Sequence, residues 1–138
     1  MDTLELSLTD IHDLAYGALA ANGCDDANAE AVARTIAAAE RDGARSHGLF
    51  RVPGYVTALR AGRVRGDADP AVQRRTAAFV QVDGAMGFAP LAIERGIREL
   101  AAAAHETGVA VMTITDSFHF AALWPEVEAL AAENLAGD

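Results

Sequence analysis

The stretch Val109-Ala110-Val111-Met112-Thr113-Ile114-Thr115 decides the fold class. It is short, apolar and rich in β-branched residues, which is typical of a strand buried within a sheet. Gly108 stands directly before it and is expected to end an amphipathic helix over residues 90–107. The apolar face of that helix carries Leu91, Ile97 and Leu100.

A second strand is expected on the other side of this helix, over residues 77–82. Asp83-Gly84 is a turn signal and is expected to close it. The segment Val82–Phe88 contains two glycines but does not match G-x-G-x-x-G, so it favours a plain turn over a dinucleotide fingerprint. Downstream, residues 116–120 are expected to form a loop and residues 124–135 a last helix.

Three helices are expected before the strands. The first covers residues 10–22, with Thr9 as its N-cap and Gly23 at its end. The second covers residues 27–42, capped by Asp25 or Asp26. The third covers residues 48–59, with Pro53 in its first turn. A helical N-terminal part followed by β-α-β-α predicts the α/β class. Because two strands make a poor sheet, we expect this to be an incomplete part of a larger fold.

Composition and charge exclude several kinds of partner. The 138 residues carry a formal charge of −9, which argues against nucleic acid or an anionic membrane as a partner. Cys24 is the single cysteine, so no internal disulfide or cysteine-based zinc site can form. No signal peptide or membrane span is apparent, and the cytoplasm is the expected location.

The motif Arg45-Ser46-His47-Gly48-Leu49-Phe50-Arg51 carries the clearest chemical signal. Histidine donates protons near neutral pH, since its unperturbed pKa is about 6.5. Ser46 can hydrogen-bond the imidazole of His47 and fix its orientation. The motif is not G-x-S-x-G, so Ser46 is a helper rather than a nucleophile. If this stretch is helical, Arg51 shares a face with His47 and can bind a carboxylate.

His119 follows the best strand, at a position where open α/β sheets hold ligands. The alternative is a histidine packed between Phe118, Phe120 and Trp124, and the sequence leaves both interpretations open. His12 and His105 are expected to be structural. The four histidines lack metal-ligand spacing, so no metal site is expected.

Two stretches resemble a known family. Asp42–Tyr55 with Leu59–Val64, and then Asp116–Pro125, resemble the malate/L-lactate dehydrogenase-like oxidoreductases, which are distinct from the Rossmann-type lactate dehydrogenases. The form His-Phe-Ala-Ala-Leu-Trp-Pro is most similar to the branch that reduces Δ1-piperideine-2-carboxylate and Δ1-pyrroline-2-carboxylate to L-pipecolate and L-proline. The resemblance covers nearly the whole chain.

This resemblance implies roles for the matching residues. Ser46 and His47 would be catalytic, with His47 as the proton donor, and Arg51 would bind the substrate carboxylate. NADPH would be the cofactor, with NADH as an alternative. The residues implied to line its site are His119, Phe120, Ala121, Ala122 and Leu123. Residues 1–75 would form a helical region with the Ser-His-Gly motif, and residues 76–138 the start of a truncated α/β cofactor-binding domain.

Three functions follow from different interpretations. The first is the cyclic imine reductase, homodimeric when complete. The second is an NAD(P)-dependent 2-hydroxy-acid dehydrogenase of the malate, lactate or sulfolactate kind. The third is a non-catalytic truncated gene product. Family members are more than twice as long, so we expect this chain to be an N-terminal portion that exposes apolar surface and is inactive by itself.

Overall fold

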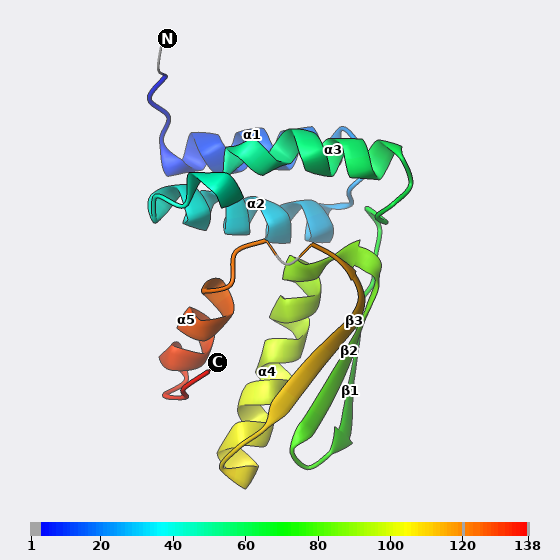
Figure 1. Cartoon of the computed structure of the whole chain (residues 1–138), viewed down its shortest axis with the longest axis vertical. Coiled ribbons are helices and arrows are strands. Elements are labelled where there is room, and N and C mark those ends of the chain that lie inside the picture. The colour runs from blue at the N-terminus through cyan, green and yellow to red at the C-terminus, as the bar shows by residue number, and fades with distance from the viewer. Residues whose placement is uncertain (1–3, 120, 138) are drawn as a thin grey trace.

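The fold has a layer of three helices stacked on an α/β layer (Figure 1). The computed structural model describes residues 4–119 and 121–137. The helical layer consists of α1 (Leu8–Ala20), α2 (Asp26–Arg41) and α3 (Val52–Arg60). Two short 3-10 turns, η1 (Arg45–His47) and η2 (Leu49–Arg51), connect α2 to α3.

The α/β layer contains β1 (Ala71–Thr76), β2 (Phe79–Phe88), α4 (Ala89–Thr107), β3 (Val111–Phe118) and α5 (Pro125–Ala132). The sheet order is β1-β2-β3, with β1 antiparallel and β3 parallel to β2. Helix α4 connects the two parallel strands and packs against the sheet (Figure 1). The α/β class expected from the sequence is confirmed.

The helix ends follow local signals. Ser7 caps α1 in a reciprocal capping box with Asp10, so Thr9 lies inside the helix and was wrongly expected to cap it. Asp25 caps α2 through the backbone N–H of Asn28, as one of the two alternatives predicted. Gly108 ends α4 in the left-handed conformation, with φ of 82°.

The strands differ from the expectation in three ways. Strand β1 was not predicted at all. Strand β2 runs through Asp83-Gly84 to Phe88, because the register shift between Asp83 and Gly87 lets the chain bulge and then continue pairing with β3. The expected turn over residues 82–88 is therefore wrong. The loop expected from residue 116 begins only after Phe118, because β3 extends to that residue.

The buried strand is β2, with Val80 and Val82 fully inaccessible. They form a core with Ala92 and Ala103 of α4. Strand β3 lies at the edge of the sheet, and Val111 is 56% exposed. The expectation that this stretch is buried was therefore wrong, because α4 packs against one face of the strand and alternate residues such as Val111 are exposed.

A larger core fills the helical layer. It joins α1, α2 and α3 through residues such as Leu19, Val32, Ile36 and Tyr55, and Phe88 at the end of β2 enters it from the α/β layer. Phe88 thereby anchors the end of the sheet beneath the helices. The two layers meet where β2 and β3 end.

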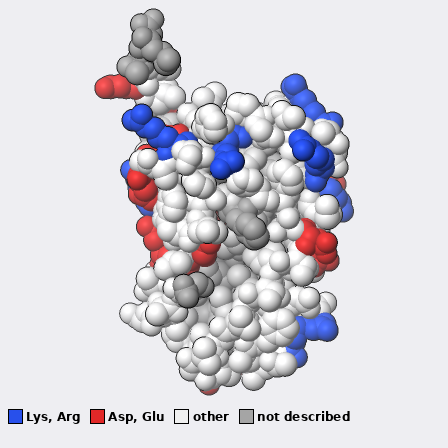
Figure 2. Space-filling view, in the orientation of Figure 1, with Lys and Arg blue, Asp and Glu red and all other residues white. Residues whose placement is uncertain are grey.

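One face of the molecule carries few charges over its lower half (Figure 2). Exposed apolar side chains of the α/β layer include Val109, Val111, Leu123 and Val127. No helix among residues 4–119 and 121–137 is long and apolar enough to cross a bilayer.

Candidate active site

The Ser-His-Gly motif lies in the two 3-10 turns between α2 and α3. The turns pack as one unit because the N–H of Gly48 donates to the carbonyl of Arg45, and the N–H of Arg51 donates to the carbonyl of Gly48. Glu40 holds this unit from the last turn of α2: its Oε1 accepts the backbone N–H of Leu49 at 2.8 Å. The stretch is therefore two linked 3-10 turns rather than the start of one continuous helix.

Ser46 and His47 are paired as expected. The Oγ of Ser46 lies 3.0 Å from Nδ1 of His47. This contact can fix the ring orientation, and it leaves Nε2 unengaged. No partner for Nε2 occurs within the part of the chain that the structure describes. The imidazole can therefore hold an exchangeable proton on that atom.

Arg51 is tied to the same motif. Its Nε donates to the carbonyl of Ser46 at 2.7 Å, which fixes the guanidinium next to the serine and histidine. Neither terminal nitrogen of Arg51 meets a protein acceptor within residues 4–119 and 121–137. Those two nitrogens have the geometry for a bidentate contact with a carboxylate.

His119 follows β3 and lies against the helical layer. Its Nδ1 accepts the N–H of Ala121 at 3.0 Å and lies 3.4 Å from the hydroxyl of Tyr55. Burial lowers the pKa of His119, and its electrostatic interactions with Arg51 and His47 lower it further. Because Nδ1 accepts a backbone N–H, the neutral form of His119 carries its hydrogen on Nε2, where it can donate.

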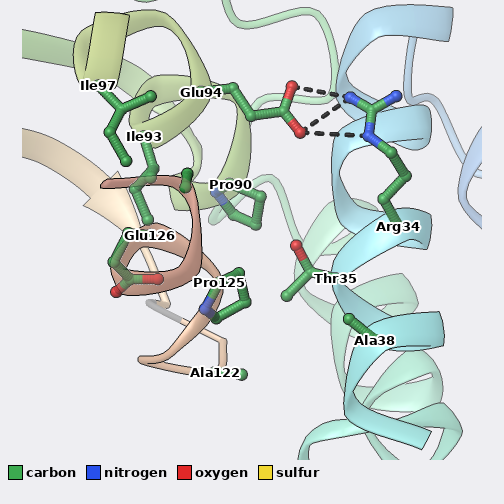
Figure 3. Close-up of a pocket in the computed structure, with 11 residues that line it drawn as sticks. Arg34, Thr35, Ala38, Pro90, Ile93, Glu94, Ile97, Ala122, Pro125 and Glu126 are labelled. Carbon is green, nitrogen blue, oxygen red and sulfur yellow. Dashed lines mark hydrogen bonds and ion pairs between the residues drawn. The ribbon is translucent and has the colours of Figure 1, made fainter. Parts of the chain in front are cut away.

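The remaining residues of the second motif take different positions. The side chains of Ala121 and Ala122 are buried, whereas Leu123 is 67% exposed. Phe120 lies outside the described residues. Ala122 reaches a separate apolar groove of about 280 Å³ between α2, α4 and α5, which Figure 3 shows beside the Arg34–Glu94 ion pair.

Four residues that the sequence reasoning missed support the two motifs, and three of them, Tyr55, Trp124 and Asp42, connect one motif to the other. Tyr55 is buried beneath His119, with 5.5 Å between the ring centroids. Trp124 meets His47 edge-on at 6.4 Å and donates its Nε1–H to Asp42. Glu40 holds the turn after His47, as described above. Their contacts join residues that are not neighbours in the sequence, so no local pattern reveals them. Asp42, Tyr55 and Trp124 lie within the two stretches that resemble the family, and this was the one signal for these three.

Two other groups carry no chemistry. Burial raises the pKa of the Cys24 thiol to about 11, so it stays protonated and unreactive near neutral pH. His12 lies between Asp13 and Glu30, at 3.1 Å from each, and joins α1 to α2.

Comparison with known proteins places this geometry in a family. The family model described as malate/L-lactate dehydrogenase matches residues 6–137. The Δ1-pyrroline-2-carboxylate reductase of Ancylobacter novellus is 44% identical over 98% of this chain and 40% of its own length. A Pseudomonas putida reductase of Δ1-pyrroline-2-carboxylate and Δ1-piperideine-2-carboxylate is 44% identical over 96% of this chain and 39% of its own.

Solved structures agree with these relatives. The Δ1-piperideine-2-carboxylate reductase of Pseudomonas syringae pv. tomato superposes with a TM-score of 0.90 at 41% identity, over 95% of this chain and 40% of that one. Malate dehydrogenase of Entamoeba histolytica superposes with a TM-score of 0.87 at 26% identity, over 96% of this chain and 37% of that one. The chain thus spans about 40% of the length of its curated relatives, and it belongs to the malate/L-lactate dehydrogenase family.

Proposed function

We propose that this chain carries the proton-donating half of an NADPH-dependent reductase of cyclic imine 2-carboxylates. The substrates would be Δ1-pyrroline-2-carboxylate or Δ1-piperideine-2-carboxylate, and the products L-proline or L-pipecolate. The observation that carries the proposal is the joint placement of His47 and Arg51 on one pair of linked turns. The names of the relatives at 44% identity support the substrate class.

Arg51 would bind the carboxylate through its two terminal nitrogens. Because its Nε is fixed to the Ser46 carbonyl, the bound carboxylate is held at a set position relative to His47. Reduction of a C=N bond needs a proton at nitrogen. Nε2 of His47 would supply that proton while Ser46 keeps Nδ1 engaged.

The loop after β3 fits a nicotinamide cofactor. It lies at the carboxyl ends of two parallel strands, and it offers His119 as a neutral hydrogen-bond donor with backbone at positive φ nearby. His119 to Leu123 would contribute to holding the cofactor, which supplies the hydride when bound. The choice of NADPH, a homodimer and the cytoplasm belong to the same proposal and rest on the family resemblance.

Binding tests the site even if this chain does not turn over. Pyrrole-2-carboxylate is a planar five-membered ring with the same carboxylate, and its binding can be followed by intrinsic fluorescence. We expect saturable binding that the variant Arg51→Gln weakens. Absence of binding by the wild-type chain would contradict the carboxylate site.

Turnover tests the reaction. In a form of the protein that turns over, NADPH oxidation with the cyclic imine should exceed that with 2-oxo acids, and the variant His47→Ala should lower it by about 10²-fold or more, the usual contribution of general acid catalysis. Near-normal turnover in this variant would refute the assignment of His47.

A 2-hydroxy-acid dehydrogenase is the second candidate. The superposition on the malate dehydrogenase of Entamoeba histolytica favours it, since the same histidine and arginine could bind a 2-oxo acid. A preference for 2-oxo acids over the cyclic imine would select this candidate.

A further inference from the structure

We propose that Trp124 is a positioning residue for His47, and that Asp42 holds Trp124 in place. The proposal rests on the proposed function, because it assigns Trp124 a role toward the proton donor. It goes beyond that function by naming an indole from the second motif as the group that fixes the imidazole of the first. The argument has two steps, from Asp42 to Trp124 and from Trp124 to His47.

The first step is a hydrogen bond that spans 82 residues of sequence. Nε1–H of Trp124 donates to Oδ2 of Asp42 at 2.8 Å. Asp42 is itself fixed by Arg41, whose Nε and Nη2 lie 2.7 and 2.8 Å from its two oxygens. This contact with Arg41, helped by the Trp124 hydrogen bond, lowers the pKa of Asp42 and keeps it an acceptor.

A second link fixes the start of α5 to the same place. Nη2 of Arg41 lies 3.4 Å from the carboxylate of Glu128, one helical turn after Trp124. Two contacts therefore hold the beginning of α5: Trp124 is bonded to Asp42, and Glu128 is paired with Arg41. The indole orientation of Trp124 is set by the end of α2, where the chain also enters the Ser-His-Gly motif.

The second step is the contact with His47. The indole and imidazole planes meet at 78°, with 6.4 Å between ring centroids, which is the edge-on arrangement that aromatic pairs prefer. Ser46 Oγ makes the second contact of the ring, at 3.0 Å from Nδ1. With both contacts present, the ring of His47 has little freedom to rotate.

The titratable and charged groups near His47 are Asp42, which holds Trp124, Arg51, which is bonded to the Ser46 carbonyl, and His119, whose pKa His47 lowers. Trp124 is neutral, as is Ser46, so its contact can fix the ring without adding charge. This separates its effect on position from an effect on protonation.

The chain has one tryptophan, so tryptophan fluorescence reports the surroundings of Trp124. An imidazolium quenches a neighbouring indole more strongly than a neutral imidazole does. We expect wild-type emission to rise as the pH goes from about 5 to about 8, the range over which histidine loses its charge. The variant His47→Gln should abolish this change, which identifies its source.

Three further variants test the role of Asp42. Asp42→Ala should reduce the amplitude of the pH change at least two-fold and make the indole more accessible to acrylamide. Asp42→Asn should restore both, because the carboxamide oxygen still accepts the indole N–H. Asp67→Ala is the matched control, since Asp67 pairs with a nearby arginine on the surface and does not contact the tryptophan. Far-UV circular dichroism checks that each variant folds.

Two results would overturn the proposal. The first is a folded Asp42→Ala variant whose pH-dependent change in emission and acrylamide accessibility both equal those of the wild type. The second is the same loss in Asp42→Asn as in Asp42→Ala, which would assign the effect to the ion pair with Arg41. No turnover is needed, so failure of this proposal is distinguishable from failure of the reductase assay.

Discussion

Replacing Gly48 by alanine should destabilise the protein through Glu40. A methyl group at Gly48 would overlap the Glu40 carboxylate and lie 2.7 Å from its Cγ. Gly48 has a φ of −90°, so lack of space rather than backbone conformation excludes a side chain. The Glu40 carboxylate can move away from the methyl group, but its hydrogen bond with the Leu49 N–H is then lost. A hydrogen bond to a charged group contributes about 1.5 to 3 kcal/mol, which is the expected loss.

A double-mutant cycle tests this reasoning by urea unfolding. Glu40→Ala alone should cost a similar amount, because it removes the same hydrogen bond. In the Glu40→Ala background the methyl group has room, so Gly48→Ala should cause no further loss of unfolding free energy. The coupling energy between the two positions should then approach 2 kcal/mol, which is within the usual range for contacting residues. Gly54→Ala is the control, since nothing lies within 4 Å of that position. Additive effects within about 0.5 kcal/mol would refute the role of Glu40.

Other perturbations give distinct outcomes. Arg51→Gln should weaken binding of a carboxylate analogue about tenfold or more, because the lost contact is worth at least about 1.4 kcal/mol; unchanged affinity in a fluorescence titration would contradict the anchor. The pKa of His12 is raised by its hydrogen bond to Asp13, so its contribution to stability is complete below about pH 6.5 and is lost as the pH rises through the folded pKa. His12→Gln should remove that loss in urea unfolding at graded pH, and an identical slope would argue against it. Val82→Ala should cost roughly 1.5 to 3 kcal/mol and Val111→Ala less than about 0.5, because the first is fully buried and the second is exposed; equal costs would contradict the assignment of β2 as the central strand.

Local signals explain what the sequence could predict. Asp25 and Gly108 mark helix ends through contacts within four residues of themselves, and these ends were found close to where they lie. The same holds for the pairing of Ser46 with His47, which are neighbours in the chain. Such features depend on backbone geometry that a short stretch of residues sets alone.

Long-range pairing explains what was missed. Asp83-Gly84 has the composition of a turn, yet the neighbouring β3 supplies hydrogen bonds that carry the strand past it to Phe88. Strand β1 carries polar residues on an exposed edge and shows no apolar alternation. The contact of Trp124 with Asp42 depends on how α5 returns to the end of α2, which no local pattern encodes.

Backbone strain at the end of β3 connects the fold to the site. Asp116, His119 and Ala121 have φ between 49° and 58°, a region that non-glycine residues occupy at a cost. Neighbouring contacts hold this backbone conformation. Phe118 packs edge-on against Phe88, and the Ala121 N–H donates to Nδ1 of His119. Because contacts within the free protein already fix that ring, a ligand at this loop does not have to order it on binding. The core that holds Phe88 under the helices therefore also fixes the position of His119, the histidine proposed to bind the cofactor. The packing of the two layers and the geometry of the site depend on the same residues.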